Sequence, residues 1–171
     1  MLFVLSAACA PAPPSSILPG NDFTVEGRII IDGPSPFDRR FRLEESDGRV
    51  WIVSGPRFES DLSMLDGNDV SVTGRVIRMD SSLRVMEIRE YRLLPGEGMA
   101  ALHGVVSVED STVFVNRLSD AKKFGMEGSL GKALIAFDRS RVWVWGESKS
   151  PAGGKPGRMT VRGYAILGPA E

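Results

Sequence analysis

The chain has 171 residues, of which 42 % are hydrophobic and 25 % charged, a composition that fits one mid-sized or two small folded domains. The 21 Lys and Arg residues nearly cancel the 22 Asp and Glu residues. Proteins that hold nucleic acid through its phosphates usually carry a basic surplus, so nucleic acid is not expected as a partner; the alternative is a local basic patch. One cysteine and one histidine exclude an internal disulfide and a multi-histidine metal site, and no metal or other cofactor is expected.

The first twenty residues differ from the rest of the chain. Residues 1–8, MLFVLSAA, are apolar and end in small side chains, and Cys9 and a Pro-rich tether come after them. This leader resembles the end of a bacterial lipoprotein signal peptide, in which a cysteine after small residues becomes lipidated. The resemblance implies a membrane anchor at Cys9 and a place in the cell envelope, at the outer membrane of a Gram-negative host. The alternative is an apolar tail with an incidental cysteine.

An internal repeat organises the remainder of the chain. Leu65–Val76, LDGNDVSVTGRV, is similar to Phe137–Ser148, FDRSRVWVWGES, with an Asp, two Val and a Gly in step. A second pair of similar segments comes later in each copy, Glu87–Leu94 and Thr160–Leu167. The repeat predicts two related β units, residues 21–95 and residues 99–168.

The first unit alternates between apolar and polar residues in several short runs. The pattern predicts five strands and, between the third and fourth, a short helix, in the order Phe23–Ile31, Arg40–Glu45, Arg49–Ser54, helix Arg57–Leu65, Asp69–Met79 and Leu83–Leu94. Gly27 in the first strand is typical of a bulge or sharp bend. This order resembles the OB-fold, a five-stranded Greek-key barrel. A five-stranded SH3-like barrel is the nearest alternative.

The second unit repeats this order less clearly. Strands are predicted at Ala101–Glu109, Thr112–Arg117, Arg141–Glu147 and Met159–Leu167. In the middle, Ser119–Phe124 is predicted as a helical turn, and Ser129–Phe137 fits either a helix or a strand. The predicted fold class is therefore all-β, with two tandem small five-stranded OB-like barrels and one or two short helices.

Three aromatic residues of the second unit are candidate contact residues. If Val142 and Val144 face the barrel core, then Trp143 and Trp145 point outward, and Phe114 shares their side. An exposed aromatic pair forms a platform for a partner, and it also suits stacking on bases or sugars. The alternative is that the pair packs against the first unit or against residues 129–137.

Arginines form a second candidate surface, on the first strands of the first unit. They are Arg28, Arg40, Arg42 and Arg49. Guanidinium groups on this face of an OB-fold suit phosphate or carboxylate ligands. Because carboxylates alternate with them along the chain, the alternative is a solvated sheet face with balanced charge.

No catalytic motif accompanies these surfaces, and the lone His103 is expected to be structural. The favoured function is a non-enzymatic cell-envelope lipoprotein that binds a partner protein or a surface polymer. The alternative function is an oligonucleotide- or oligosaccharide-binding OB-fold protein that uses the arginine-bearing strands of the first unit.

Overall fold

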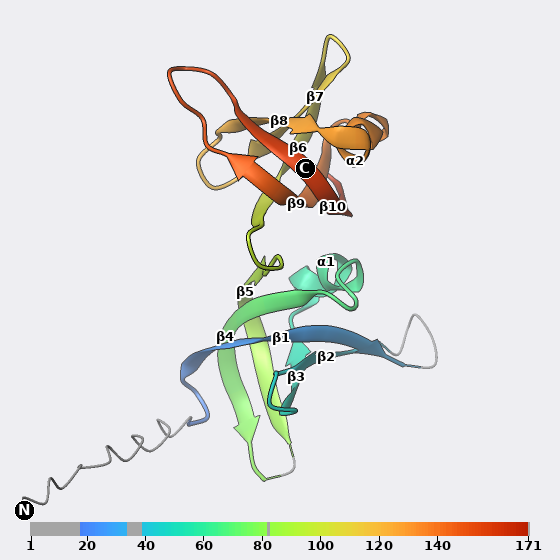
Figure 1. Ribbon diagram of the computed structural model, residues 1–171. Helices are drawn as coiled ribbons and strands as arrows, with labels where there is room; N and C mark the ends of the chain where they lie inside the picture. Colours follow the sequence, from blue (N-terminus) through green and yellow to red (C-terminus); the bar gives the residue numbers. More distant parts are fainter. Residues whose placement is uncertain (1–17, 34–38, 82, 171) are drawn as a thin grey trace, which may run out of the picture.

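The computed structural model describes residues 18–33, 39–81 and 83–170. Within these ranges the chain forms two closed five-stranded barrels, one after the other along the sequence (Figure 1). The predicted all-β class with tandem OB-like barrels is confirmed. The predicted lipidation site, Cys9, lies outside the described residues.

The first barrel has the strand order β1-β2-β3-β5-β4 and closes by antiparallel pairing of β1 with β4. Its only parallel pair among the described strands joins β3 to β5. A 3-10 turn and a one-turn helix connect β3 to β4. The elements are β1 (Asp22–Asp32), β2 (Arg40–Glu44), β3 (Val50–Ser54), η1 (Pro56–Phe58), α1 (Glu59–Ser63), β4 (Asp69–Met79) and β5 (Arg84–Leu93).

The second barrel has the equivalent order, β10-β8-β7-β6-β9, with β8 parallel to β10. Its elements are β6 (Ala100–Glu109), β7 (Thr112–Arg117), β8 (Lys123–Glu127), α2 (Gly128–Ala133), η2 (Leu134–Phe137), β9 (Ser140–Lys149) and β10 (Gly157–Pro169). Residues 129–137 are thus helical, which settles the ambiguous segment.

The helical turn predicted at Ser119–Phe124 is wrong, because the third strand of the barrel begins there, at Lys123. This strand has five residues, with Phe124 and Met126 buried and a glycine between them. So short a run carries too few residues to show a period in the sequence.

The repeated residues have the same structural role in both barrels. Asp66 Oδ1 accepts a hydrogen bond from the Ile31 amide at 3.1 Å, and Asp138 Oδ1 accepts one from the Val108 amide at 3.1 Å. Each aspartate therefore ties the segment before the fourth strand to the end of the first strand of its own barrel.

Glycines make a matched close approach in the first strand of each barrel. A Cβ at Gly27 would collide with the carbonyl oxygen of Glu44, and a Cβ at Gly104 with that of Asn116. Both glycines permit the sharp bend by which the first strand contributes to both sides of the barrel.

Side chains connect the two barrels. Trp143, Ala165 and Leu167 of the second barrel pack against the buried cluster of the first. Helix α1 lies on the side of the first barrel that faces the second (Figure 1). Among the described residues no helix has the length and hydrophobicity to cross a membrane.

Candidate ligand-binding faces

In OB barrels the second and third strands, with the loops beside them, form the usual ligand surface. These strands are β2 and β3 in the first barrel and β7 and β8 in the second. The two faces have the same position in the fold but different side chains.

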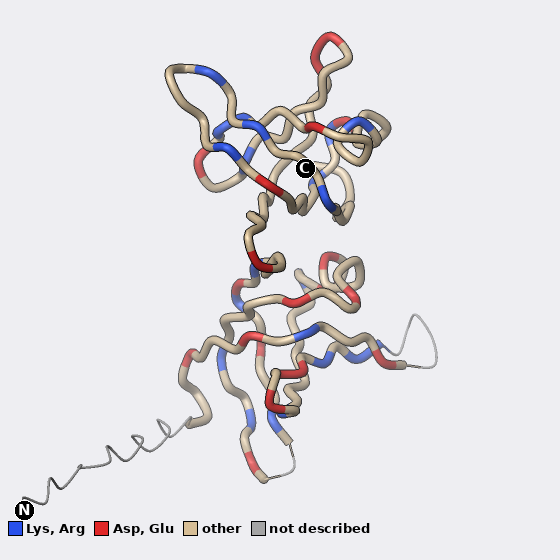
Figure 2. The backbone as a smooth tube through the Cα atoms, in the orientation of Figure 1, with Lys and Arg blue, Asp and Glu red and all other residues tan. Residues whose placement is uncertain are grey.

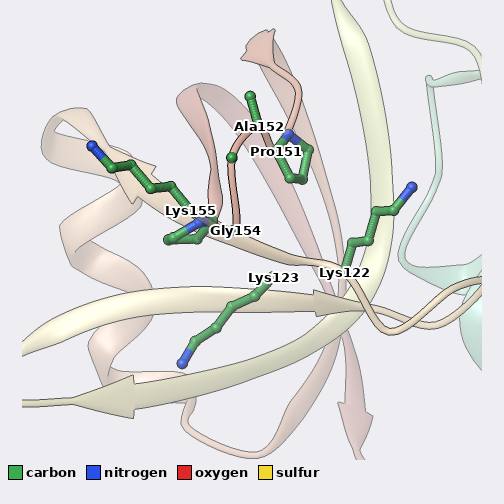
Figure 3. Close-up of a pocket in the computed structure, with 8 residues that line it drawn as sticks. Lys122, Lys123, Pro151, Ala152, Gly154 and Lys155 are labelled. Carbon is green, nitrogen blue, oxygen red and sulfur yellow. The ribbon is translucent and has the colours of Figure 1, made fainter.

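On the second barrel, a surface pocket of about 360 Å³ lies between the start of β8 and the loop that joins β9 to β10. Its lining is Lys122, Lys123, Pro151, Ala152, Gly153, Gly154, Lys155 and Pro156. Figure 3 shows that the three lysine amines point in different directions rather than toward one point. Spread amines suit an extended anionic chain better than a single small anion, because each can meet a different charge along it.

Next to the pocket, Phe114 lies half-buried on the outer side of β7, opposite Gly125 of β8. The amine of Lys123 stands 4.2 Å from the centre of its ring. The same amine donates a hydrogen bond to the Glu109 carboxylate at 2.5 Å. The pocket therefore has an aromatic ring at its side, as base or sugar stacking requires.

The turn before β8 is held by a network around Asp120. Its carboxylate accepts two hydrogen bonds from the Arg117 guanidinium, at 2.6 and 2.5 Å, and one from the Lys122 amide at 3.3 Å. Hydrogen bonds from the Arg117 side chain and from Lys122 hold the pKa of Asp120 well below its usual range. The turn that carries Lys122 is thus held in place by hydrogen bonds to the Asp120 carboxylate.

Of the three pocket lysines, Lys155 is the least engaged. Lys122 lies 3.2 Å from Asp120, and Lys123 pairs with Glu109. Lys155 is exposed, and it has no ion-pair partner in the part of the chain that the structure describes. Its charge is available to a ligand without the loss of an existing ion pair.

On the first barrel, the predicted arginines are mostly neutralised. Arg28 pairs with Asp69 at 3.1 Å, Arg42 with Asp32 at 2.6 Å, and Arg49 with both Glu45 and Asp47. Arg40 is exposed at the start of β2. Figure 2 shows acidic and basic residues interspersed along these strands.

The hollow on this barrel is acidic. It measures about 650 Å³ and is lined by Glu26, Gly27, Arg28, Ile30, Glu44, Glu45, Ser46, Asp69 and Leu94. Four carboxylates thus surround one guanidinium, and an anionic ligand would meet net repulsion there.

The two tryptophans of β9 lie in different surroundings. Trp143 is buried, with 6 % of its surface exposed, and packs against the first barrel, so an external partner cannot contact its ring. The valines on either side of it face the second barrel's core, as predicted. Trp145 is half-buried beside Gly163 and lines a small hollow with Leu94 and the linker after it.

Sequence reasoning missed the three pocket lysines. The sequence feature that could have pointed to them is the loop SPAGGKPG, residues 150–157. Its position between the last two strands of an OB-like barrel places it beside the usual ligand surface of that fold. In the described ranges no group of three or more His, Cys, Asp and Glu side chains is arranged to hold a metal ion.

No protein-family model matches the chain, and no curated protein matches it. The solved structures that are weakly similar include the following two. The tetrameric p202 HIN2 is 12 % identical, with 85 % of this chain and 94 % of that chain covered and a TM-score of 0.30. A deletion mutant of the single-stranded DNA binding protein from Thermus aquaticus is 11 % identical, with 84 % and 92 % covered and a TM-score of 0.27.

One expectation is corrected. A single-stranded DNA binding protein stands among the similar structures, whereas nucleic acid is not expected as a partner from the overall charge. That expectation uses the charge of the whole chain, which averages over two unlike barrels and hides a local gathering of lysines on one of them.

Proposed function

We propose that the protein is a non-catalytic OB-fold binding protein for single-stranded oligonucleotides, and that the face formed by β7, β8 and the loop 150–156 is its ligand surface. The observation that carries the proposal is the set of Lys122, Lys123 and Lys155 spread around one pocket beside Phe114. A backbone of regularly spaced phosphates meets separated amines, while a base stacks on the ring.

Oligonucleotide binding changes the partners of Lys123. A phosphate takes the place of the Glu109 carboxylate beside the Lys123 amine, and the amine moves away from the ring of Phe114. The open face of the ring then accepts a base. Stacking of this kind contributes about 1–3 kcal/mol per base.

The salt dependence of binding tests the proposal. Three phosphate contacts on a single strand give a slope of about −2 in log K against log salt, so affinity falls about 16-fold between about 50 and about 200 mM salt. The measurement is fluorescence anisotropy of a labelled oligothymidylate with the full chain. A Kd on the order of 10⁻⁴–10⁻⁶ M at physiological salt is expected.

Two variants separate this surface from general charge effects. Lys155→Ala is expected to weaken binding and to reduce the slope by about 0.7. Lys132→Ala is the matched control, because Lys132 is also an exposed lysine but lies on α2, outside the pocket. Equal effects of the two variants, or no binding by the full chain, would contradict the proposal.

A second candidate function rests on the leader. We propose that Cys9 is lipidated and anchors the protein in the cell envelope, where it binds a partner protein or a surface polymer. The small residues before Cys9 and the Pro-rich tether after it support this proposal. Intact mass and fractionation of the chain expressed in a bacterial host test it. Cleavage before Cys9 with added acyl chains is the expected result, and an unmodified chain in the cytosol is the contradicting one.

A further inference from the structure

A cluster of five side chains, the latch, joins the two barrels. Asp61 on α1 and Tyr91 on β5 come from the first barrel, and His103 on β6 with Arg141 and Trp143 on β9 from the second. The latch lies away from the ligand pocket, and its role is independent of the proposed function.

The latch is centred on a buried carboxylate. Asp61 is only 4 % exposed. Its Oδ1 accepts a hydrogen bond from Arg141 Nη2 at 3.0 Å, and its Oδ2 accepts one from the Tyr91 hydroxyl at 2.9 Å. Trp143 Nε1 donates to the Tyr91 hydroxyl oxygen at 3.3 Å. A charge buried across the interface is thus paired and hydrogen-bonded from both barrels, and removal of one partner leaves it uncompensated.

His103 completes the latch by stacking on Trp143, with ring centres 4.7 Å apart and an angle of 14° between the rings. Its Nε2 is buried and has no hydrogen-bond partner in the described part of the chain. The imidazole therefore fits the interface as a neutral, flat, largely apolar ring.

Protonation changes this fit. A second proton would place a cation on a half-buried ring whose Nε2 has no acceptor, and the Arg141 guanidinium would oppose this charge. The charged groups that act on His103 are Asp61, which favours the cation, and Arg141, which opposes it. Burial acts most strongly and lowers the pKa of His103 below its ordinary value.

We propose that the latch is proton-sensitive: it holds the barrels together at neutral pH, and protonation of His103 releases the second barrel from the first. In the released state the imidazole lies in water and binds its proton at the ordinary pKa of about 6.5. The released state therefore binds more protons than the closed state. The stability of the contact falls as the pH drops below about 6.5, and it stops falling once the pH is below the depressed pKa of the closed state.

The test uses the full chain and NMR between pH 7.5 and pH 5. The indole N–H signal of Trp143, assigned with Trp143→Phe, reports the hydrogen bond to Tyr91, and ¹⁵N relaxation reports whether the barrels tumble together. Because the chain has a single histidine, the ring signals of His103 give its titration directly. The expected result is a shift of the Trp143 indole N–H signal and faster, separate tumbling of the two barrels as the pH falls. The midpoint of both changes is expected to coincide with the midpoint of the His103 titration.

Two variants serve as references for the closed and the open state of the latch. His103→Phe keeps a flat ring on Trp143 but cannot be protonated, so the latch is expected to stay closed at pH 5. Asp61→Asn leaves Arg141 without its charge partner and supplies the signals of the open state at pH 7.5.

Three outcomes would overturn the proposal. They are no change in the wild-type interface between pH 7.5 and pH 5, a midpoint that differs from that of His103, and an unchanged acid response in His103→Phe. If His103→Phe does not fold, the wild-type chain alone decides, because the midpoint of the interface change can be compared with the midpoint of the His103 titration.

Discussion

The two barrels share the residues that make the fold and differ in those that face outward. Asp66 and Asp138 make the same hydrogen bond to a strand amide, and Gly27 and Gly104 make the same close approach. At the ligand face, however, arginines are paired with carboxylates on the first barrel, whereas three lysines surround a pocket on the second. The fold and the charge of its outer surface can therefore diverge independently within one chain.

The barrels also differ on the outward side of their fourth strand, where Ser71 in β4 is matched by Trp143 in β9. Trp143→Ala is expected to lower the free energy of unfolding by about 3–5 kcal/mol, because it empties a buried site of a large ring. Urea denaturation followed by circular dichroism measures the loss. Trp145→Ala is the matched control, with a smaller loss expected for a half-buried ring. Equal losses would contradict the assigned role of Trp143.

The matched glycines are expected to respond alike. Gly27→Ala and Gly104→Ala each place a Cβ against a backbone carbonyl and should cost about 2 kcal/mol, as overpacking typically does. Thermal denaturation compares them with Gly125→Ala, whose Cβ would meet Phe114 at an ordinary 3.7 Å. A cost at Gly125 as large as at the other two would show that the close approach is not the cause.

The repeated aspartates should also be equivalent. Asp66→Ala and Asp138→Ala each remove the acceptor of one strand amide, for which a loss of about 1 kcal/mol is expected. Urea midpoints measure both variants in parallel. Asn at either position keeps an acceptor oxygen and should restore part of the loss. A large difference between the two alanine variants would break the equivalence of the barrels.

The smallest effect is expected where the barrels differ in charge. Lys155→Ala should weaken oligonucleotide binding about threefold, which corresponds to about 0.7 kcal/mol for an exposed ion pair. Arg42→Gln on the first barrel should leave binding unchanged, since its guanidinium is held by Asp32. Anisotropy titrations at equal salt measure both. A larger effect of Arg42→Gln would assign the ligand to the first barrel instead.

Much of the fold could be predicted from the sequence. The repeated Asp, Val and Gly residues mark equivalent strands, because burial and close packing fix which residue types stand there. The third strand of the second barrel could not be predicted, because its five residues, with a glycine in the middle, are too few to show an alternating pattern.

The candidate sites were harder to predict. The outward direction of Trp143 follows from strand alternation, but alternation does not say that the other barrel covers it. The ion pairs of Arg28 and Arg42 depend on which strands are neighbours. The lysine pocket depends on two loops that meet only in the folded barrel.

The measurement that tests the central claim most directly is an NMR titration of the ¹⁵N-labelled full chain with an oligothymidylate. Binding at the proposed surface predicts amide shifts concentrated at residues 114, 122–125 and 152–155 of the second barrel, with little change at 40–44 and 50–54 of the first. Shifts concentrated on the first barrel, or none on either, would contradict it.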